Sequence, residues 1–222
     1  MSSEAITPLL ISLKVALGAT IVILPPGILL GLLLARRDFP GKSIVETMTS
    51  LPLVLPPTAV GYLLLRLFAR TGPLGAESLG FDLDLLFTWK GAVVASSIMA
   101  LPLVARSARV AFELVDPKLE AMGRTLGLGR VGAFTRITLP LARRGLLSAA
   151  ILGFSRAIGE FGATVIVAGS IRGRTQTLAL AIFEDMQIGH DREAMILIGI
   201  TVVLAFAAIW SVELLLRRTP RT

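Results

Sequence analysis

Two long runs of uncharged residues constrain this chain more than any other feature of its sequence. Val15–Ala35 holds 21 residues and Ala194–Val212 holds 19 residues without Asp, Glu, Lys or Arg. As α-helices these runs would extend about 31 and 28 Å, close to the roughly 30 Å hydrocarbon core of a bilayer. The whole chain is 54% hydrophobic and 17% charged, whereas soluble domains have about 45–50% apolar and about 25% charged residues. The sequence therefore predicts a membrane protein and argues against a soluble enzyme.

Three further apolar segments complete the predicted set of membrane spans. Leu51–Leu65 and Gly91–Ala105 have 15 uncharged residues each, so their flanking arginines would have to extend toward the head groups. Gly145–Ile171 is long enough but carries one arginine and one glutamate. Thr177–Phe183 is too short to cross and predicts a helix on the outer face. We therefore predict an all-α membrane protein, a single domain over 1–222, with five spans at about 9–35, 50–69, 89–110, 145–170 and 194–216.

The distribution of basic residues predicts the orientation of these spans. With the N-terminus outside, 14 Lys and Arg residues fall on the inner side and six fall outside. The inner set includes a C-terminal tail with Arg217, Arg218 and Arg221. The positive-inside rule therefore selects an outer N-terminus and an inner C-terminus. The net charge of +7 is explained by topology, and no basic stripe interleaved with aromatic residues indicates a nucleic-acid partner.

Residues for bond chemistry or nucleotide binding are not arranged as an enzyme would need them. The chain has no cysteine and one histidine, His190, which excludes a thiolate metal site and a histidine cluster. Gly127–Gly132 spells G-x-G-x-x-G, but a polar helix-forming stretch precedes it and no acidic residue follows until Glu160. Gly41–Ser43 resembles the end of a P-loop, but Arg36 stands where the leading glycine is required. We predict that this chain binds no cofactor or metal, and that any ATP is bound by a partner.

Prolines and glycines interrupt the predicted spans. Pro52, Pro56 and Pro57 fall within seven residues of the second span, and each removes a backbone donor and bends or breaks a helix. They indicate either a broken helix beside a translocation pathway or ordinary kinks that serve packing. Gly27 and Gly31 form a G-x-x-x-G pair in the first span, a pattern typical of close helix packing.

The segment 113–144 is the most informative part of the chain outside the predicted spans. Asp116 and Pro117 indicate a helix start, with an Asp cap followed by proline at the first position. Gly127 is typical of a helix end. The intervening helix carries an apolar stripe at i, i+3 and i+7: Leu119, Met122 and Leu126. A helix of about ten residues is unstable alone, so the stripe either packs on the membrane end of this chain or docks a soluble subunit.

A motif within this segment resembles one of a known family. Glu120-Ala121-Met122 is followed by Gly127 and, after nine residues, by Ile137-Thr138-Leu139-Pro140. This resembles the EAA loop of ABC importer permeases, with Met122 in place of the third residue and one extra residue before Gly127. In that family the loop forms a coupling helix that docks in a groove of the ATP-binding subunit. The resemblance implies ATPase coupling for Leu119, Glu120, Ala121, Met122, Leu126, Gly127, Ile137, Leu139 and Pro140.

The resemblance extends over nearly the whole chain. Further matching segments are FPGK (39–42), LPLVLPP (51–57) leading to GY (61–62), RTLG (124–127) and GEFGAT (159–164). Together they are similar to the molybdate permeases, the membrane subunits of molybdate importers. Sulfate permeases share the EAA loop and a stretch like GEFG, but the proline-rich second span followed by Gly-Tyr is more typical of the molybdate group.

The resemblance implies a type I ABC importer permease in the inner (plasma) membrane. It would work as a homodimer with two ATPase subunits and an external molybdate-binding protein, and ATP and Mg would bind to the ATPase. Sulfate or tungstate are alternative substrates. A secondary anion transporter is the alternative class, but it would need internal repeats and coupling-ion carboxylates at the midplane, where Glu160 is the only mid-span carboxylate.

Two opposite charges fall inside the fourth predicted span. Arg156 and Glu160 are four residues apart, which on a continuous helix places both on one face. An unpaired charge in the hydrocarbon costs about 2.5–3.5 kcal/mol on insertion scales, so the two residues are expected to pair. The pair either holds this span against its neighbours or presents Arg156 to a transported anion.

Overall fold

The computed structural model describes residues 3–217, and every regular element in that range is a helix. The all-α prediction is confirmed. The basic tail residues Arg218 and Arg221 lie outside the described residues. The elements are α1 (Ser3–Arg36), α2 (Lys42–Val54), α3 (Pro57–Phe68), α4 (Ala76–Leu79), α5 (Trp89–Glu113), α6 (Pro117–Thr125), α7 (Arg130–Ala133), a π-helical turn η1 (Phe134–Thr138), α8 (Leu139–Ile158), α9 (Gly162–Val167), α10 (Leu178–Gln187) and α11 (Asp191–Arg217).

Four helical segments are long and apolar enough to cross a membrane. They are Ile6–Arg36, Trp89–Glu113, Arg130–Ile158 and Asp191–Leu214. The pair α2 and α3 passes the same test together, although the two helices meet at an angle of 110°. With this pair counted as one broken span, the described residues contain five candidate spans, as the sequence predicts.

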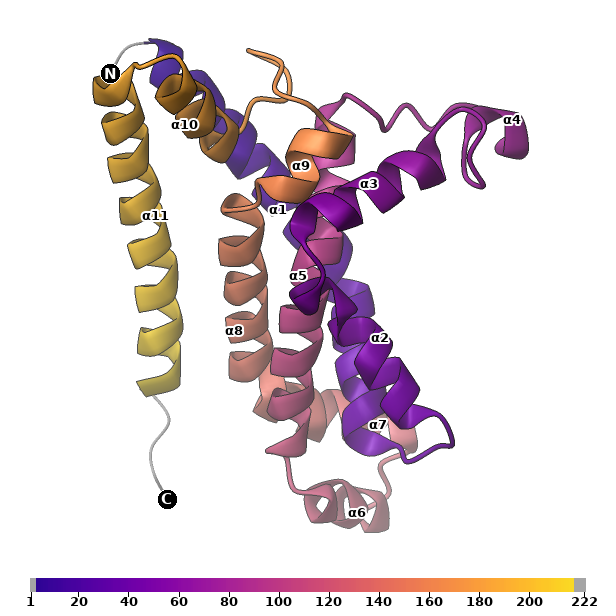
Figure 1. The fold of residues 1–222 in the computed structure, drawn as a ribbon. Coiled ribbons are helices and arrows are strands. Elements are labelled where there is room, and N and C mark those ends of the chain that lie inside the picture. The colour runs from indigo at the N-terminus through magenta and orange to yellow at the C-terminus, as the bar shows by residue number, and fades with distance from the viewer. Residues whose placement is uncertain (1–2, 218–222) are drawn as a thin grey trace.

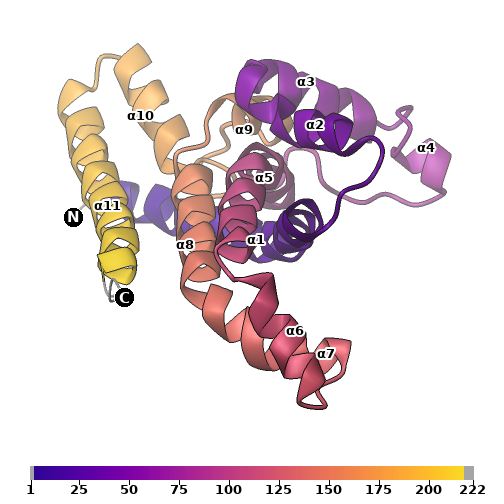
Figure 2. The ribbon, with the colours of Figure 1, turned by 90° about the horizontal axis from the view of Figure 1, so that it is seen from below.

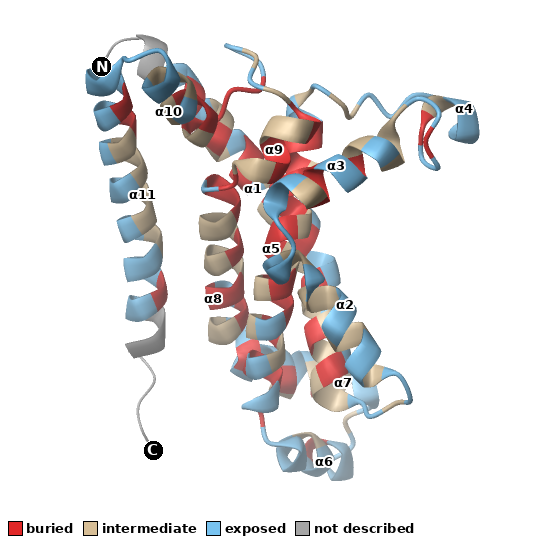
Figure 3. Ribbon diagram, viewed as in Figure 1, coloured by how far each residue is buried: buried red, intermediate tan, exposed pale blue. Residues whose placement is uncertain are grey.

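Helix α5 lies at the centre of the bundle, and α1 packs along it (Figures 1 and 2). Fourteen of its residues are buried, and Figure 3 shows the buried positions concentrated on α5. A Cβ on Gly27 would lie 2.6 Å from Val104 Cγ1, and one on Gly31 would lie 2.7 Å from Ala108 Cβ. The G-x-x-x-G pair therefore serves helix packing, as expected, because only glycine lets the two backbones approach so closely.

The remaining helices pack around this central pair. Helix α8 contacts both α1 and α5, and α11 contacts α8 and α10 at the edge of the bundle. Helix α10 is ten residues long, too short to cross a bilayer, as predicted for this segment. Its buried residues Leu178, Leu180 and Ala181 hold it in place, and Leu178 packs with Leu197 of α11.

The structure differs from the sequence-based expectation at the fourth span. A single helix was expected over 145–170, but α8 ends at Ile158 and the short helix α9 begins at Gly162. Conversely, the helical path starts earlier than expected, because α7, η1 and α8 form one candidate span from Arg130. Figure 1 shows α8 reaching only part of the way along α11, with α9 turned across its end.

Different segments of the chain form the two ends of the bundle. Helix α6 lies at one end, next to the last turns of α1 and α5 (Figure 1). The opposite end carries α4, α10, the first turns of α1, α5 and α11, and the loop that joins α9 to α10. The two ends are therefore separated by the full length of the spanning helices.

Candidate functional site: the coupling helix and two adjacent helix breaks

Helix α6 begins and ends where its sequence predicts. The side chain of Asp116 accepts a hydrogen bond from the Lys118 N–H at 2.9 Å, and Pro117 is the first helical residue. At the other end Gly127 has φ of +92°. The Gly127 N–H donates to Arg124 O and the Leu128 N–H donates to Gly123 O, which is the Schellman pattern that closes a helix on glycine. Both ends of this short helix are therefore fixed by local interactions.

The apolar stripe of α6 faces away from the protein. Leu119, Met122 and Leu126 are 42%, 61% and 85% exposed, and Figure 3 shows α6 largely exposed at the end of the bundle. Next to the stripe lies the buried Gly123, where a Cβ would lie 2.4 Å from Ile137 Cδ1. The stripe does not pack on the membrane helices of this chain, so the expectation that it might do so is wrong. The exposed stripe fits a partner surface.

Glu120, the first residue of the EAA-like motif, fastens α6 to the membrane helices. Its carboxylate lies 3.0 Å from Arg36 Nη2 in the last turn of α1. It also accepts a hydrogen bond from the Thr138 hydroxyl, which is fully buried in η1. Arg36 Nη2 in addition donates to Val115 O at 3.1 Å. Glu120 therefore joins α6 to the end of α1 and to the turn that leads into α8.

The other predicted coupling residues fall into two groups. Ala121 is exposed on another face of α6, whereas Ile137 lies under α6 against Gly123 and supports the helix. Leu139 and Pro140 form the exposed first turn of α8. Sequence reasoning did not assign a role to Arg36 or Thr138. The signal that could have found them is Glu120 itself, because a carboxylate so close to a membrane end needs a cation or a hydroxyl.

The prolines of the second span break the helix. Helix α2 ends at Val54, Leu55 and Pro56 are extended, and α3 starts with Pro57 as its first residue. Of the two alternatives that the sequence leaves open, the structure shows a broken helix at Pro56 and Pro57, whereas Pro52 lies inside α2.

This break lies against the break between α8 and α9. A Cβ on Gly162 would lie 2.7 Å from Pro57 Cβ, and one on Gly61 would lie 2.9 Å from Ala163 Cα. Two interruptions that are about a hundred residues apart in sequence are therefore in contact. Interrupted helices are tolerated at membrane depth where protein or a water-filled cavity satisfies the backbone, so this junction is the place where a pathway is most easily built.

Arg156 and Glu160 form the expected ion pair at this junction, but they do not share a helix. Arg156 Nη1 lies 2.6 Å from Glu160 Oε2, and the side chain of Glu160 is 2% exposed. Because α8 ends at Ile158, Glu160 lies in the break, and the expectation that both residues occupy one helix face is wrong. Glu160 Oε1 also accepts a hydrogen bond from the Ala163 N–H at 2.9 Å. One carboxylate thus neutralises Arg156 and caps the start of α9.

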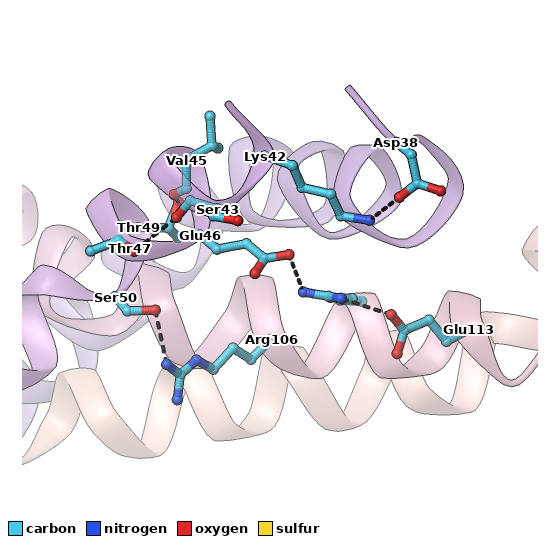
Figure 4. Close-up of polar contacts among 11 residues, drawn as sticks. Asp38, Lys42, Ser43, Val45, Glu46, Thr47, Thr49, Ser50, Arg106 and Glu113 are labelled. Atoms are coloured by element: carbon cyan, nitrogen blue, oxygen red, sulfur yellow. Dashed lines mark hydrogen bonds and ion pairs between the residues drawn. The ribbon is translucent and has the colours of Figure 1, made fainter. Parts of the chain in front are cut away.

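Polar contacts hold α2 to α5, and sequence reasoning did not anticipate them. Helix α2 has no buried residue. Arg109 Nη1 lies 2.6 Å from Glu46 of α2, Arg109 Nε lies 2.7 Å from Glu113, and Arg106 donates to Ser50 at 2.9 Å. Figure 4 shows Glu46 and Ser50 directed from α2 toward α5. Glu46 and Arg109 are far apart in sequence, so no local pattern identifies the pair.

The loop between α9 and α10 is fastened through one carboxylate. Glu184 of α10 accepts hydrogen bonds from Arg172 at 2.7 Å and from Gln176 at 2.6 Å. Burial raises the pKa of Glu184, but hydrogen bonds and charge from Arg172, with Ser170 and Gln176, outweigh it, so the pKa lies below its ordinary value. At neutral pH the ionised carboxylate therefore holds the loop against α10.

The sequence also matches a known protein family. Residues 27–220 match the family of binding-protein-dependent transport system inner membrane components. The chain belongs to this family. Among the described residues no group of three or more His, Asp or Glu could hold a metal ion, and the G-x-G-x-x-G run follows helix α6, not a strand.

Curated relatives match this permease over most of its length. It is 42% identical over 210 residues to the molybdenum transport system permease protein ModB of Escherichia coli K12, covering 94% of this chain and 92% of the relative. It is 39% identical to the putative molybdenum transport system permease protein YvgM of Bacillus subtilis, over 96% of this chain and 94% of the relative. A sulfate transport system permease protein, CysT of Salmonella typhimurium, is 30% identical over 88% of this chain and 70% of the relative.

Solved structures show the same fold. A bacterial ABC transporter that imports the acidic polysaccharide alginate has a chain that superposes with a TM-score of 0.76 at 18% identity, covering 99% of this permease and 81% of that chain. An amino acid ABC transporter superposes with a TM-score of 0.67 at 18% identity, covering 97% of this permease and 94% of that chain. The permease therefore has the fold of ABC importer membrane subunits.

Proposed function

We propose that this chain forms the translocation pathway of an ATP-driven molybdate importer. It works as a homodimer in the plasma membrane with two ATPase subunits and an external molybdate-binding protein. The N-terminus lies outside, and α6 and the C-terminus lie on the cytoplasmic side. ATP and Mg bind to the ATPase, and this chain changes conformation without bond chemistry.

The observation that carries the proposal is the construction of α6. Its apolar stripe is exposed, while Glu120 on another face is fastened to Arg36 and Thr138. A short helix with both ends capped and a free apolar face can follow a partner as a rigid unit. Curated relatives that match nearly the whole chain carry molybdenum transport in their names, and this supports molybdate as the substrate.

The contacts of α6 suggest how movement of an ATPase reaches the pathway. A pull on α6 acts on the end of α1 through Arg36 and on the start of α8 through Thr138. Helix α8 ends beside the junction of the two helix breaks, where Pro57 contacts Gly162. We propose that this junction opens and closes as α8 moves, because rigid helices joined at breaks rotate about them. In this scheme Arg156 attracts the molybdate dianion, and Glu160 holds the side chain of Arg156 in place.

Transport by purified components tests the proposal. The chain is expressed with the ATPase subunit of a molybdate importer and reconstituted into liposomes with the external binding protein inside or outside. We expect ATP-dependent accumulation of molybdate, stimulated by the binding protein, and no ATP hydrolysis by this chain alone. Leu126→Asp should abolish the stimulation of molybdate uptake by the binding protein, because it places a charge on the apolar stripe. Lys118→Gln, off the stripe on the same helix, should leave this stimulation intact.

Competing anions test the substrate within the same assay. Sulfate is the substrate named for the 30% identical relative. Uptake of sulfate in preference to molybdate would overturn the substrate but keep the importer. Anion uptake by this chain without an ATPase would overturn the importer and indicate a secondary transporter.

A further inference from the structure

A basic cavity lies at the end of the bundle opposite α6. The residues that line it are not among those proposed for coupling or for the pathway. Its volume is about 340 Å³, and it is lined by α1, the start of α5 and the loop that joins α9 to α10. Three cationic side chains from these three segments converge on it: Lys14, Lys90 and Arg174. Segments that are distant in sequence thus contribute one positive charge each to the same cavity.

Among the residues that the structure describes, one of the three charges is neutralised by a neighbour. Asp84 lines the cavity and pairs with Lys90 at 3.3 Å. Lys14 Nζ lies 3.8 Å from the centroid of the Trp89 ring, a contact that orients a cation without cancelling its charge. Among the described side chains, neither Lys14 nor Arg174 forms a salt bridge. The cavity therefore carries two positive charges in excess and favours an anion.

The wall of the cavity is held in a strained conformation. Asp84 and Phe87 have φ of +49° and +56°, a region that costs energy for residues other than glycine. The Phe87 N–H donates to Val167 O at 2.9 Å, and the Thr88 hydroxyl donates to Leu85 O at 2.8 Å. These bonds fix the loop, so Asp84 stands beside Lys90 and the cavity keeps its shape.

The depth of the cavity in the membrane follows from the sequence and the packing of α1 on α5. The uncharged runs of the two helices begin at Val15 and Gly91. The two helices are level there, because a Cβ on Gly18 would lie 3.0 Å from Val93 Cγ2. Lys14 and Trp89 thus lie next to the start of the uncharged runs of both helices. Tryptophan is enriched at the membrane–water boundary, and head-group phosphates lie at the same level.

We infer that this cavity binds a tetrahedral oxyanion, supplied by the phosphate of an anionic phospholipid in the leaflet opposite α6. Lys14 and Arg174 contact the phosphate oxygens, and Trp89 lies against the glycerol region. Basic pockets between transmembrane helices bind anionic head groups in this way. With the orientation proposed above, the lipid belongs to the outer leaflet, but the site itself depends only on the cavity and its charges.

Tryptophan quenching provides a test at the site itself. The chain has two tryptophans, so Trp210→Phe leaves Trp89 as the only reporter. The full chain with this change is reconstituted into phosphatidylcholine with brominated acyl chains, and unbrominated phosphatidylglycerol is titrated in. We expect phosphatidylglycerol to relieve the quenching of Trp89 with an affinity about 30-fold above that of unbrominated phosphatidylcholine, because each basic residue near a membrane surface contributes about fivefold.

Matched variants separate this site from general surface charge. Lys14→Gln with Arg174→Gln should abolish the preference for phosphatidylglycerol, and Lys14→Arg with Arg174→Lys should retain it. Arg66→Gln with Arg192→Gln removes two charges outside the cavity and should leave the preference intact. In the converse reporter, Trp89→Phe, Trp210 of α11 should show no preference between the lipids. Monodisperse elution and retained ATPase binding establish that each variant is folded.

Three results would overturn the inference. One is an equal preference for phosphatidylglycerol in the wild-type protein and in the Lys14→Gln, Arg174→Gln variant. Another is a saturable response of Trp89 to free molybdate, sulfate or phosphate without any lipid preference, which would assign the cavity to a soluble oxyanion. The third is the absence of any lipid preference in the wild-type protein together with lost stimulation by the binding protein in the double variant, which would assign the cavity to that protein.

Discussion

Replacing Glu160 by glutamine separates the charge of this residue from its hydrogen bond. Glu160 Oε2 lies 2.6 Å from Arg156 Nη1, and Oε1 accepts from the Ala163 N–H at 2.9 Å. The carbonyl oxygen of glutamine can still accept the Ala163 hydrogen bond and cap α9. The charge that neutralises Arg156 is lost, so the variant isolates the ion pair.

The expected loss of stability follows from the burial of the two side chains. Removing one partner of a buried ion pair costs about 3–5 kcal/mol. Glu160 is 2% exposed, whereas Arg156 is 29% exposed and keeps part of its hydration. We therefore expect the free energy of unfolding to fall by about 3 kcal/mol, the lower end of this range. This corresponds to a fall of about 6–12 °C in the unfolding temperature of a domain of this size. Glu160→Ala also removes the cap and should cost about 1 kcal/mol more.

The neutral double variant distinguishes a structural pair from a pathway arginine. Arg156→Gln with Glu160→Gln leaves no buried charge and keeps the cap on α9. If the pair is purely structural, the double variant regains most of the lost stability and also transports molybdate. If Arg156 attracts the anion, the double variant regains stability but not uptake. Exchanging the two charges is a poorer test, because Glu160→Arg would direct a cation at the Ala163 N–H.

The assay measures the unfolding temperature of the purified chain in detergent, its binding to the ATPase, and molybdate uptake in liposomes. Glu77→Gln serves as the control, because Glu77 and Arg70 form an exposed pair with side chains 54% and 82% accessible and such pairs contribute about 0–1 kcal/mol. An unfolding temperature for Glu160→Gln within about 2 °C of this control would refute the reasoning.

Three further predictions concern residues whose geometry is equally specific. Gly127→Val should weaken ATPase binding, measured by co-purification, because φ of +92° costs about 1–2 kcal/mol for a residue with a Cβ; Gly129→Val, at φ of −68°, is the control. Leu126→Asp should leave the unfolding temperature unchanged, because Leu126 is 85% exposed, yet lower ATPase affinity by about tenfold or more. Glu184→Gln should speed amide exchange in the loop before α10 at neutral pH, since the pKa of Glu184 is lowered in the folded protein. This stabilisation is present above the ordinary value of 4.5 and is lost as pH falls through the lower folded pKa, so a difference that persists at low pH would contradict it.

Local signals were sufficient to predict an all-helical fold and both ends of α6. Asp116 and Gly127 act through hydrogen bonds between residues at most five positions apart, and Pro117 acts through its fixed φ, so a short stretch of sequence contains all that is needed. The same holds for the break at Pro57, because a proline acts on its own helix turn. These features agree with the structure because no distant residue is needed to form them.

Contacts between distant segments were not predictable from the sequence. Arg36 was considered only as one of the inner basic residues and as the residue that breaks the P-loop pattern, yet it binds Glu120, 84 residues further along the chain. The end of α8 at Ile158 was missed because the uncharged residues around Arg156 and Glu160 favour a continuous span by hydropathy alone. Glu160 terminates that span by bonding the Ala163 N–H, a cap that periodicity does not reveal.

The adjacency of the two helix breaks has a physical reason. Each break leaves backbone groups without helical partners, and such groups are costly in hydrocarbon. Gly61 and Gly162 let α3 and α9 approach closely, because a Cβ on either would lie within 3 Å of the facing segment. Glu160 satisfies one freed N–H and Arg156 at once. Residues 55–58 of the first break remain exposed, so its contact with α9 involves the start of α3 and not the whole break. Because α3 and α9 approach so closely, a change in the angle of α8 has to be accompanied by a change at α3. This coupling is what an alternating pathway requires.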